Sequence, residues 1–224
     1  MLRKLLILLF ILCGTVCGTF SYAQIFSPME KQNRSDDSTW MSPSKFELFQ
    51  LNVPLLESKL KKSFKLTFPL PGGKHVEFQC IENNLLPGSL REKYNLRAWD
   101  LRNAEGSGKL DWTTLGLRAS FNFQGSRYYL EPRYFGEKKI VQLFEAKHSP
   151  QKDEFKCQTY HADHEGQVSD SHKADGTIGT IKRVFDIAIA VTGEYTNFYG
   201  GTVAGALSGI TTTLNRANEI YERD

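Results

Sequence analysis

The sequence predicts an α+β protein: a β-rich domain with two short helices, followed by one strand–helix unit of the α/β type. Residues 46–159 contain short apolar runs separated by turn-forming residues, which is typical of successive strands. Residues 160–182 contain few large apolar side chains. Residues 183–224 combine an almost continuous apolar run with apolar positions three and four residues apart. With 40% hydrophobic and 24% charged residues in 224, the composition is that of a folded globular chain.

The N-terminus has the three parts of a secretory signal peptide. Two basic residues precede an uncharged apolar run from Leu5 to Cys17, and small residues stand just before Gln24. The apolar run is shorter than the ~20 residues that span a bilayer. We therefore expect a signal peptide over 1–23, cleaved between Ala23 and Gln24, and a secreted or periplasmic protein without a stable membrane anchor. The alternative is an uncleaved N-terminal anchor.

Signal removal leaves a nearly neutral chain with two cysteines. The net charge falls from +3 to +1 because Arg3 and Lys4 leave, and no basic cluster with interleaved aromatic residues is present. This excludes the charge pattern of a nucleic-acid-binding protein. Of four cysteines, Cys80 and Cys157 remain. Export permits a disulfide, so these two residues form one bridge or stay as free thiols, and the spacing leaves both open.

The first predicted elements follow a polar lead-in over residues 24–45. A strand is expected over 47–53, ended by Pro54, and leucines at positions 55, 56 and 60 predict a short helix. Apolar and polar residues alternate over 64–68 and again over 76–80. A Pro-Leu-Pro-Gly-Gly segment between them predicts a hairpin, because glycine adopts the positive φ that the turn requires.

The remaining β-rich part predicts a second helix and further strands. Residues 85–94 indicate a short helix, and residues 110–123 with 128–131 indicate a second hairpin around Gly125. Residues 139–145 indicate one more strand. The total is six or seven strands and two short helices, which is sufficient for an independent core.

The last segment predicts a buried strand and an amphipathic helix. Residues 183–192 are apolar in the manner of a strand that is buried on both faces. Gly200 and Gly201 interrupt the chain, and Thr202 is a plausible N-cap. Apolar residues then recur at helical spacing: Val203, Ala206, Leu207, Ile210, Leu214, Ala217 and Tyr221.

A single strand and helix cannot bury two apolar faces by themselves. We therefore expect residues 183–224 to be the incomplete N-terminal part of a domain in a longer protein, with the remainder of that domain as partner. In the alternative, the unit docks onto the preceding β-rich domain and completes it.

Residues 183–224 resemble a known family. Ala-Val-Thr-Gly-Glu-Tyr-Thr over 190–196 and the segment 218–224 are similar to the opening of bacterial reprolysin-like (adamalysin-type) zinc metallopeptidases, which are metzincins. In that family this stretch forms the first strand and first long helix of the α/β catalytic domain. More loosely, Leu-Pro-Gly-Gly over 70–73 and Tyr-Tyr-Leu-Glu-Pro over 128–132 resemble the family's propeptide.

The resemblance implies Zn²⁺ and protein substrates for the full-length precursor. Family chemistry depends on His-Glu-x-x-His-x-x-Gly-x-x-His, in which three histidines hold the metal and the glutamate acts on bound water. The motif is missing from these 224 residues, so the chain alone is expected to contain no catalytic residue and to be inactive. The sequence has five histidines, none of which is part of this motif: His75, His148, His161, His164 and His172.

Cys157 has a further interpretation, which comes from the resemblance. Precursors of metzincins often use a propeptide thiolate to occupy the open zinc position, because Zn²⁺ binds thiolate tightly. Cys157 near the end of the propeptide-like domain could act in this way. A Cys80–Cys157 disulfide is the competing interpretation. His161 and His164 are most simply solvated residues of the linker.

Three functions follow from these patterns. The first is the front of a secreted zinc metalloendopeptidase zymogen: signal peptide (1–23), lead-in (24–45), propeptide-like domain (46–159), linker (160–182) and the start of the peptidase domain (183–224). The second is a stand-alone secreted β-rich binding or inhibitor module. The third is a non-functional truncated product. The reading frame beyond Asp224 discriminates among them.

Overall fold

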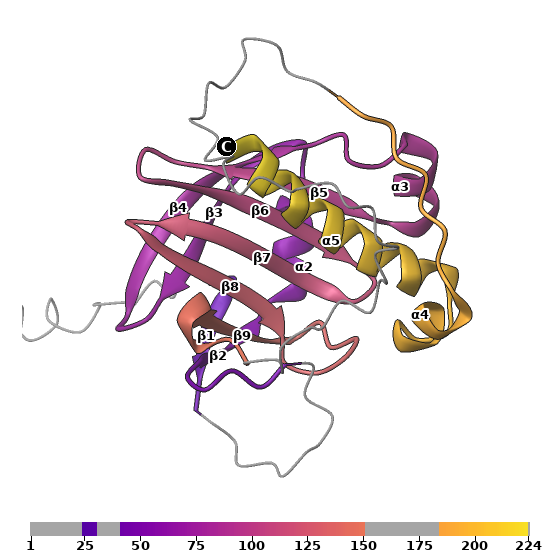
Figure 1. Ribbon diagram of the computed structural model, residues 1–224. Helices are drawn as coiled ribbons and strands as arrows, with labels where there is room; N and C mark the ends of the chain where they lie inside the picture. Colours follow the sequence, from indigo (N-terminus) through magenta and orange to yellow (C-terminus); the bar gives the residue numbers. More distant parts are fainter. Residues whose placement is uncertain (1–23, 31–40, 151–183, 224) are drawn as a thin grey trace, which may run out of the picture.

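One strongly curled antiparallel sheet dominates the protein. The computed structural model describes residues 24–30, 41–150 and 184–223, and these contain nine strands in the order β1-β2-β9-β8-β7-β6-β5-β4-β3 (Figure 1). The strands are β1 (Phe26–Met29), β2 (Glu47–Leu51), β3 (Ser63–Leu70), β4 (Lys74–Glu82), β5 (Arg97–Arg102), β6 (Gly106–Thr113), β7 (Gly116–Phe123), β8 (Ser126–Pro132) and β9 (Ile140–Glu145).

Short helices connect or follow the strands, and the longest helix lies at the C-terminal end. The helices are α2 (Val53–Lys59), α3 (Gly88–Tyr94), α4 (Gly193–Phe198) and α5 (Val203–Arg223), with a 3-10 turn η1 (Ala146–His148). Helix α5 lies across the outer face of the sheet and packs on β6 (Figure 1). Within the described ranges, no helix is both long and apolar enough to cross a membrane.

Local hairpins build most of the sheet. Gly72 and Gly73 have φ angles of 78° and 75° in the β3–β4 turn, and Gly125 has a φ of 77° in the β7–β8 turn. Glycine adopts this region without steric cost, so these turns form where the sequence places glycine. The exception to local pairing is β9, which lies between β2 and β8.

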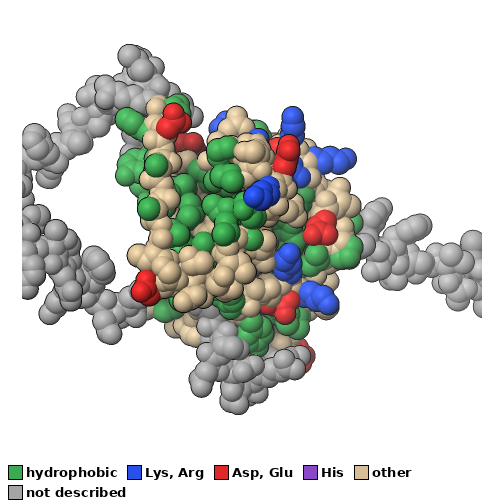
Figure 2. Space-filling view, turned by 90° about the vertical axis from the view of Figure 1, so that its right-hand side faces the viewer, with side chains coloured by type: hydrophobic (Ala, Val, Ile, Leu, Met, Phe, Trp, Pro, Cys, Tyr) green, Lys and Arg blue, Asp and Glu red, His purple; other side chains and the backbone are tan. Residues whose placement is uncertain are grey.

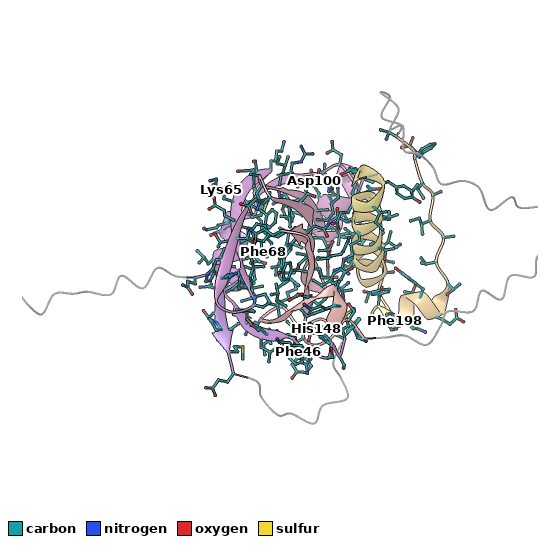
Figure 3. All side chains as sticks on the ribbon, turned by 60° about the vertical axis from the view of Figure 1, so that its left-hand side comes forward. Phe46, Lys65, Phe68, Asp100, His148 and Phe198 are labelled. Atoms are coloured by element: carbon teal, nitrogen blue, oxygen red, sulfur yellow. The ribbon has the colours of Figure 1, made fainter. Side chains whose placement is uncertain are left out.

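The apolar core fills the inside of the curl. Phe68, Phe78 and Phe121 are fully buried there, and the ring centroids of Phe68 and Phe121 lie 5.0 Å apart. Leu56 of α2 enters the same core. Phe68 points into this interior, whereas Lys65 on the same strand points outward (Figure 3). The period of two along each strand therefore assigns one face to the core and leaves the other face for polar residues.

Two glycines shape the corner between α4 and α5. The backbone turns at Gly200 and Gly201, with φ angles of 90° and 71°. The first turn of α5 is capped by Thr202, whose Oγ1 accepts a hydrogen bond from the Gly205 N–H at 3.0 Å. A side chain at position 205 or 209 would collide with Tyr199, so glycine at both positions allows the close approach.

Most of the fold class and local elements are confirmed. The protein is α+β, and α2, α3, both hairpins, β2, β9 and the Thr202 cap lie where the sequence placed them. The expected count of six or seven strands is too low. Strand β1, inside the polar lead-in, and strand β5 were missed. The run 110–123, expected as one arm of a hairpin, is two strands, because the chain turns between Thr113 of β6 and Gly116 of β7.

The expected strand over 183–192 is wrong in the described part of it. Residues 184–192 run beside α5 without forming helix or strand (Figure 1). Their side chains are exposed, including Val184 at 81% and Ile187 at 65%. The apolar composition is that of a buried strand, but no neighbouring strand in the described ranges pairs with it.

Candidate functional site

The contact between α5 and the sheet contains most of the buried polar side chains of the described structure. The side chains that α5 buries against the sheet are small or polar; the polar ones include Ser208, Thr212, Asn215 and Glu219. These residues follow one another at helical spacing on one face. The apolar periodicity predicted the helix correctly, but this face of α5, and not the apolar one, lies on the domain.

The sheet presents a matching set of polar side chains. Lys109 and Asp111 of β6 point outward between core residues, and they pair across the ladder with Ser120 and Arg118 of β7. All four are buried beneath α5 or beside it. Strand alternation places these groups on the face opposite the core, where α5 can contact them.

The centre of the contact is a network of carboxylates and guanidinium groups. The Thr212 hydroxyl donates to Asp111 Oδ2 at 2.8 Å, and Arg118 Nη1 donates to the Thr212 hydroxyl at 3.4 Å. Glu131 of β8 pairs with Arg118, with 3.5 Å between Oε2 and Nε, and also with Arg216 of α5. Each buried carboxylate thus has cationic or hydroxyl partners, as burial of charge requires.

Two further clusters hold the C-terminal half of α5. The Glu219 carboxylate accepts hydrogen bonds from Ser120 Oγ at 2.7 Å, Asn122 Nδ2 at 3.1 Å and Arg127 Nη2 at 2.9 Å. The Lys109 ammonium bridges Asp100 of β5 at 2.8 Å and Glu222 of α5 at 2.6 Å. Charge-assisted hydrogen bonds of this kind are stronger than neutral ones.

Neutral hydrogen bonds complete the contact along the rest of α5. Ser208 Oγ lies 2.8 Å from Thr114 Oγ1. Asn215 Nδ2 donates to the Leu110 carbonyl at 3.1 Å, and its Oδ1 accepts from Asn83 Nδ2 at 3.0 Å. Paired polar groups, and not apolar packing, therefore determine how α5 is aligned on the sheet.

Burial raises the pKa of Asp111 to about 6, against the attraction of Arg216 and Arg118 and the hydrogen bond from Thr212; Glu131 adds to the rise. The folded structure therefore favours the protonated form of Asp111 more than the unfolded chain does. The stability that the raised pKa of Asp111 contributes is complete below the ordinary pKa of 3.8 and is lost as pH rises through about 6. A rise from 3.8 to about 6 corresponds to about 3 kcal/mol.

Asp111→Asn is expected to remove the loss of stability that follows when the buried Asp111 ionises at higher pH. The variant should unfold with about the same free energy as the wild type near pH 4 and with a larger free energy at pH 7.5. Urea titrations of both proteins at several pH values measure the difference, in which the contributions of all other groups cancel. Parallel pH profiles for the two proteins would contradict the expectation.

An apolar groove lies on the opposite side of α5. It has a volume of about 380 Å³, between the 189–192 segment and the outward face of the helix. Figure 2 shows hydrophobic side chains gathered on this face of the molecule. Tyr195 of α4 closes one side and packs on Tyr199, with ring centroids 4.7 Å apart. The groove is lined by Ile189, Ala190, Val191, Thr192, Tyr195, Ile210, Thr213 and Leu214.

Phe198, the last residue of α4, is not part of a core. Phe198 (labelled in Figure 3) is 64% exposed. Its ring lies edge-on to that of Tyr199, with the centroids 5.1 Å apart. Glu194 lies in the first turn of α4, exposed, and hydrogen bonds to its own backbone N–H and to Thr192 lower its pKa.

Of the predicted site residues, the structure describes Cys80 and Gln24. Cys80 is buried in the core, and burial raises the pKa of its thiol to about 12, so as a thiol it is a poor nucleophile and ligand. Cys157, its predicted disulfide partner or zinc ligand, lies outside the described residues, as do His161, His164, His172 and Ala23. Gln24 is described and exposed. Both interpretations of Cys157 and the cleavage site stay predictions.

What sequence reasoning missed is the polar contact itself. A signal was present, because Ser208, Thr212, Asn215 and Glu219 form a polar stripe along α5. Their partners lie about a hundred residues earlier; for example, Ser120 and Glu219 are separated by 99 residues. Only the folded sheet places them opposite one another.

The comparison with protein families bears on this same helix. Residues 181–224 match the family described as metallo-peptidase family M12B, reprolysin-like. The matched stretch includes α4, α5 and the groove between them and residues 189–192. It is therefore related to reprolysin-like metallopeptidases. No curated protein and no solved structure matches the chain.

The M12B relationship implies zinc for a full-length enzyme. In the part of the chain that the structure describes, no group of three His, Cys, Asp or Glu side chains is placed to hold a metal ion. The two described histidines lie on different elements: His75 is on β4, and His148 is in η1, with its Nδ1 3.3 Å from Ser44 Oγ. These residues do not fit a zinc site, and no catalytic step is assigned to them.

Proposed function

We propose that the chain is the front part of a secreted zinc metalloendopeptidase precursor. In this proposal residues 1–23 are the signal peptide and the nine-stranded domain is the propeptide. The peptidase domain begins at about residue 183. The family match over 181–224 supports the position of that boundary.

The observation that carries the proposal is the attachment of α5. This helix belongs to the matched peptidase stretch, yet its polar face is bound by side chains of β6, β7 and β8 of the preceding domain. A propeptide must contact the enzyme that it accompanies. The Glu131–Arg216 and Arg127–Glu219 ion pairs supply specific contacts of this kind.

The opposite side of α5 supports a larger peptidase domain. The apolar groove and the exposed residues 184–192 lie on the side of α5 that faces away from the sheet. Exposed apolar surface of this extent indicates a place for further protein. In the proposal, the remainder of the peptidase domain adds strands beside 184–192 and covers the groove.

The reading frame beyond codon 224 tests the proposal first. We expect it to continue into His-Glu-x-x-His-x-x-Gly-x-x-His. The full-length precursor should then bind one zinc ion per chain, measured by atomic absorption. After removal of the propeptide it should hydrolyse an unfolded protein substrate. A glutamine in place of the motif glutamate is the matched control, which should retain zinc and lose hydrolysis.

The opposite outcome is equally specific. A stop codon directly after Asp224, together with a monomeric secreted chain that binds no zinc, would contradict a peptidase precursor. That result would favour a stand-alone β-rich module, in which α5 completes the outer face of the sheet.

A further inference from the structure

The core of the sheet does not depend on α5. Every member of the main apolar cluster comes from the strands, from α2 or from the segments that join them. Among the buried apolar residues of the described chain, α5 contributes Ala206 alone. Removal of α5 would therefore leave the interior of the curled sheet covered as before.

The surfaces that meet at α5 are compatible with water on both sides. Undocking would expose Lys109, Asp111 and Arg118 on the sheet, and Thr212 and Glu219 on the helix. The apolar side of α5 faces the groove already in the docked state. Separation thus exposes little new apolar area, so the hydrophobic term that holds most helices in place is small here.

Opposite charges face each other at three positions of the helix. Arg216 faces Glu131, Glu219 faces Arg127, and Glu222 faces Lys109. These pairs lose favourable energy on separation, but each charged group then regains its hydration. Attachment is a balance of charge interactions, and dissolved salt weakens such interactions more than it weakens an apolar core.

We infer that α5 is a detachable clasp: it binds and leaves the polar face of the sheet in an equilibrium governed by charge, while the sheet stays folded. Detachment requires only residues of this chain, so it holds whether or not a zinc motif follows Asp224. In a precursor, the same equilibrium would set how readily the β-rich domain separates from the peptidase segment. The polar face would then stay soluble after separation.

Hydrogen exchange of the full 224-residue chain, followed by mass spectrometry, tests the clasp. Glu219→Gln removes one charge from the contact and keeps the size of the side chain. The matched control is Glu57→Gln, the same change on the exposed side of α2. Each protein is measured in 0.05 M and 0.5 M NaCl, and peptides from α5 are compared with peptides from β3 and β4.

In the wild type, α5 amides should exchange faster than those of β3 and β4, and high salt should accelerate α5 alone. Glu219→Gln should accelerate α5 exchange by about tenfold or more, because hydrogen bonds to charged groups are lost. The exchange of β3 and β4 should stay unchanged, and Glu57→Gln should match the wild type.

Three outcomes would overturn the clasp. The first is a single common exchange rate for α5 and the sheet in the wild type at both salt concentrations. The second is equal acceleration by Glu57→Gln, which would indicate a general effect of charge. The third is acceleration of β3 and β4 together with α5 in high salt. The salt series uses the wild type, so it decides the question even where Glu219→Gln unfolds the whole chain.

Discussion

Replacement of Glu131 by alanine is expected to release α5 while the sheet stays folded. Glu131 is 1% exposed, and its carboxylate neutralises both Arg118 and Arg216. Removal of one partner from a buried ion pair typically costs about 3–5 kcal/mol, because the remaining charge stays buried. Undocking relieves that cost by returning both guanidinium groups to water, so the helix should leave before the sheet unfolds.

Limited proteolysis within α5 and far-ultraviolet circular dichroism measure the release. Glu131→Ala should be cut in α5 at a protease concentration that leaves the wild type intact, and the nine-stranded core should survive. The double variant Glu131→Ala/Arg216→Met supplies the control, since it removes both members of one pair. It should be less impaired than Glu131→Ala, as coupling between contacting residues requires. Additive effects of the two substitutions would contradict this account.

Replacement of Phe121 by alanine should destabilise the whole sheet and not α5 alone. Phe121 is fully buried at the centre of the curl, and its ring contacts those of Phe68, Phe78 and Tyr128. Deletion of such a side chain typically costs about 3–5 kcal/mol in lost burial and in the cavity left behind. The whole sheet should unfold at a lower urea concentration, and α5 should lose its site at the same point.

Phe185→Ala is the matched control for that experiment. It deletes the same side chain at a position that is 74% exposed. The free energy of unfolding should change by about 0.5 kcal/mol or less, as is usual for surface substitutions. A comparable loss in the free energy of unfolding of both variants would show that the apolar core inside the curled sheet does not supply most of the stability.

The parts of the fold that the sequence predicted are those with local causes. Glycines at 72 and 73 placed one hairpin, and Gly125 placed another, because the backbone conformation of a turn is set by its own residues. Helices α2 and α3 were also predicted from short spacing. Strand β5 was missed because its sequence, RAWDLR, alternates only from Trp99 to Arg102, and the adjacent Ala98 and Trp99 are both buried.

The orientation of α5 could not be predicted in the same way. Amphipathic periodicity indicates that a helix has an apolar side, and the usual assumption is that this side faces the domain. Here the partners of the polar side lie on β6, β7 and β8, and the fold alone brings them under the helix. The same limit explains the wrong strand over 183–192, since an apolar run does not show whether a partner strand is present.

The position of β9 has a consequence for the order in which the protein assembles. Strands β3 to β8 pair only with neighbours in the chain, and such contacts close short loops quickly. The pairing of β2 with β9 instead joins Glu47 to Leu143, which are separated by nearly the whole sequence of the domain. Loop closure of that length is slow relative to hairpin formation. We expect strands β3 to β8 to be paired before β1 and β2 join the sheet through β9.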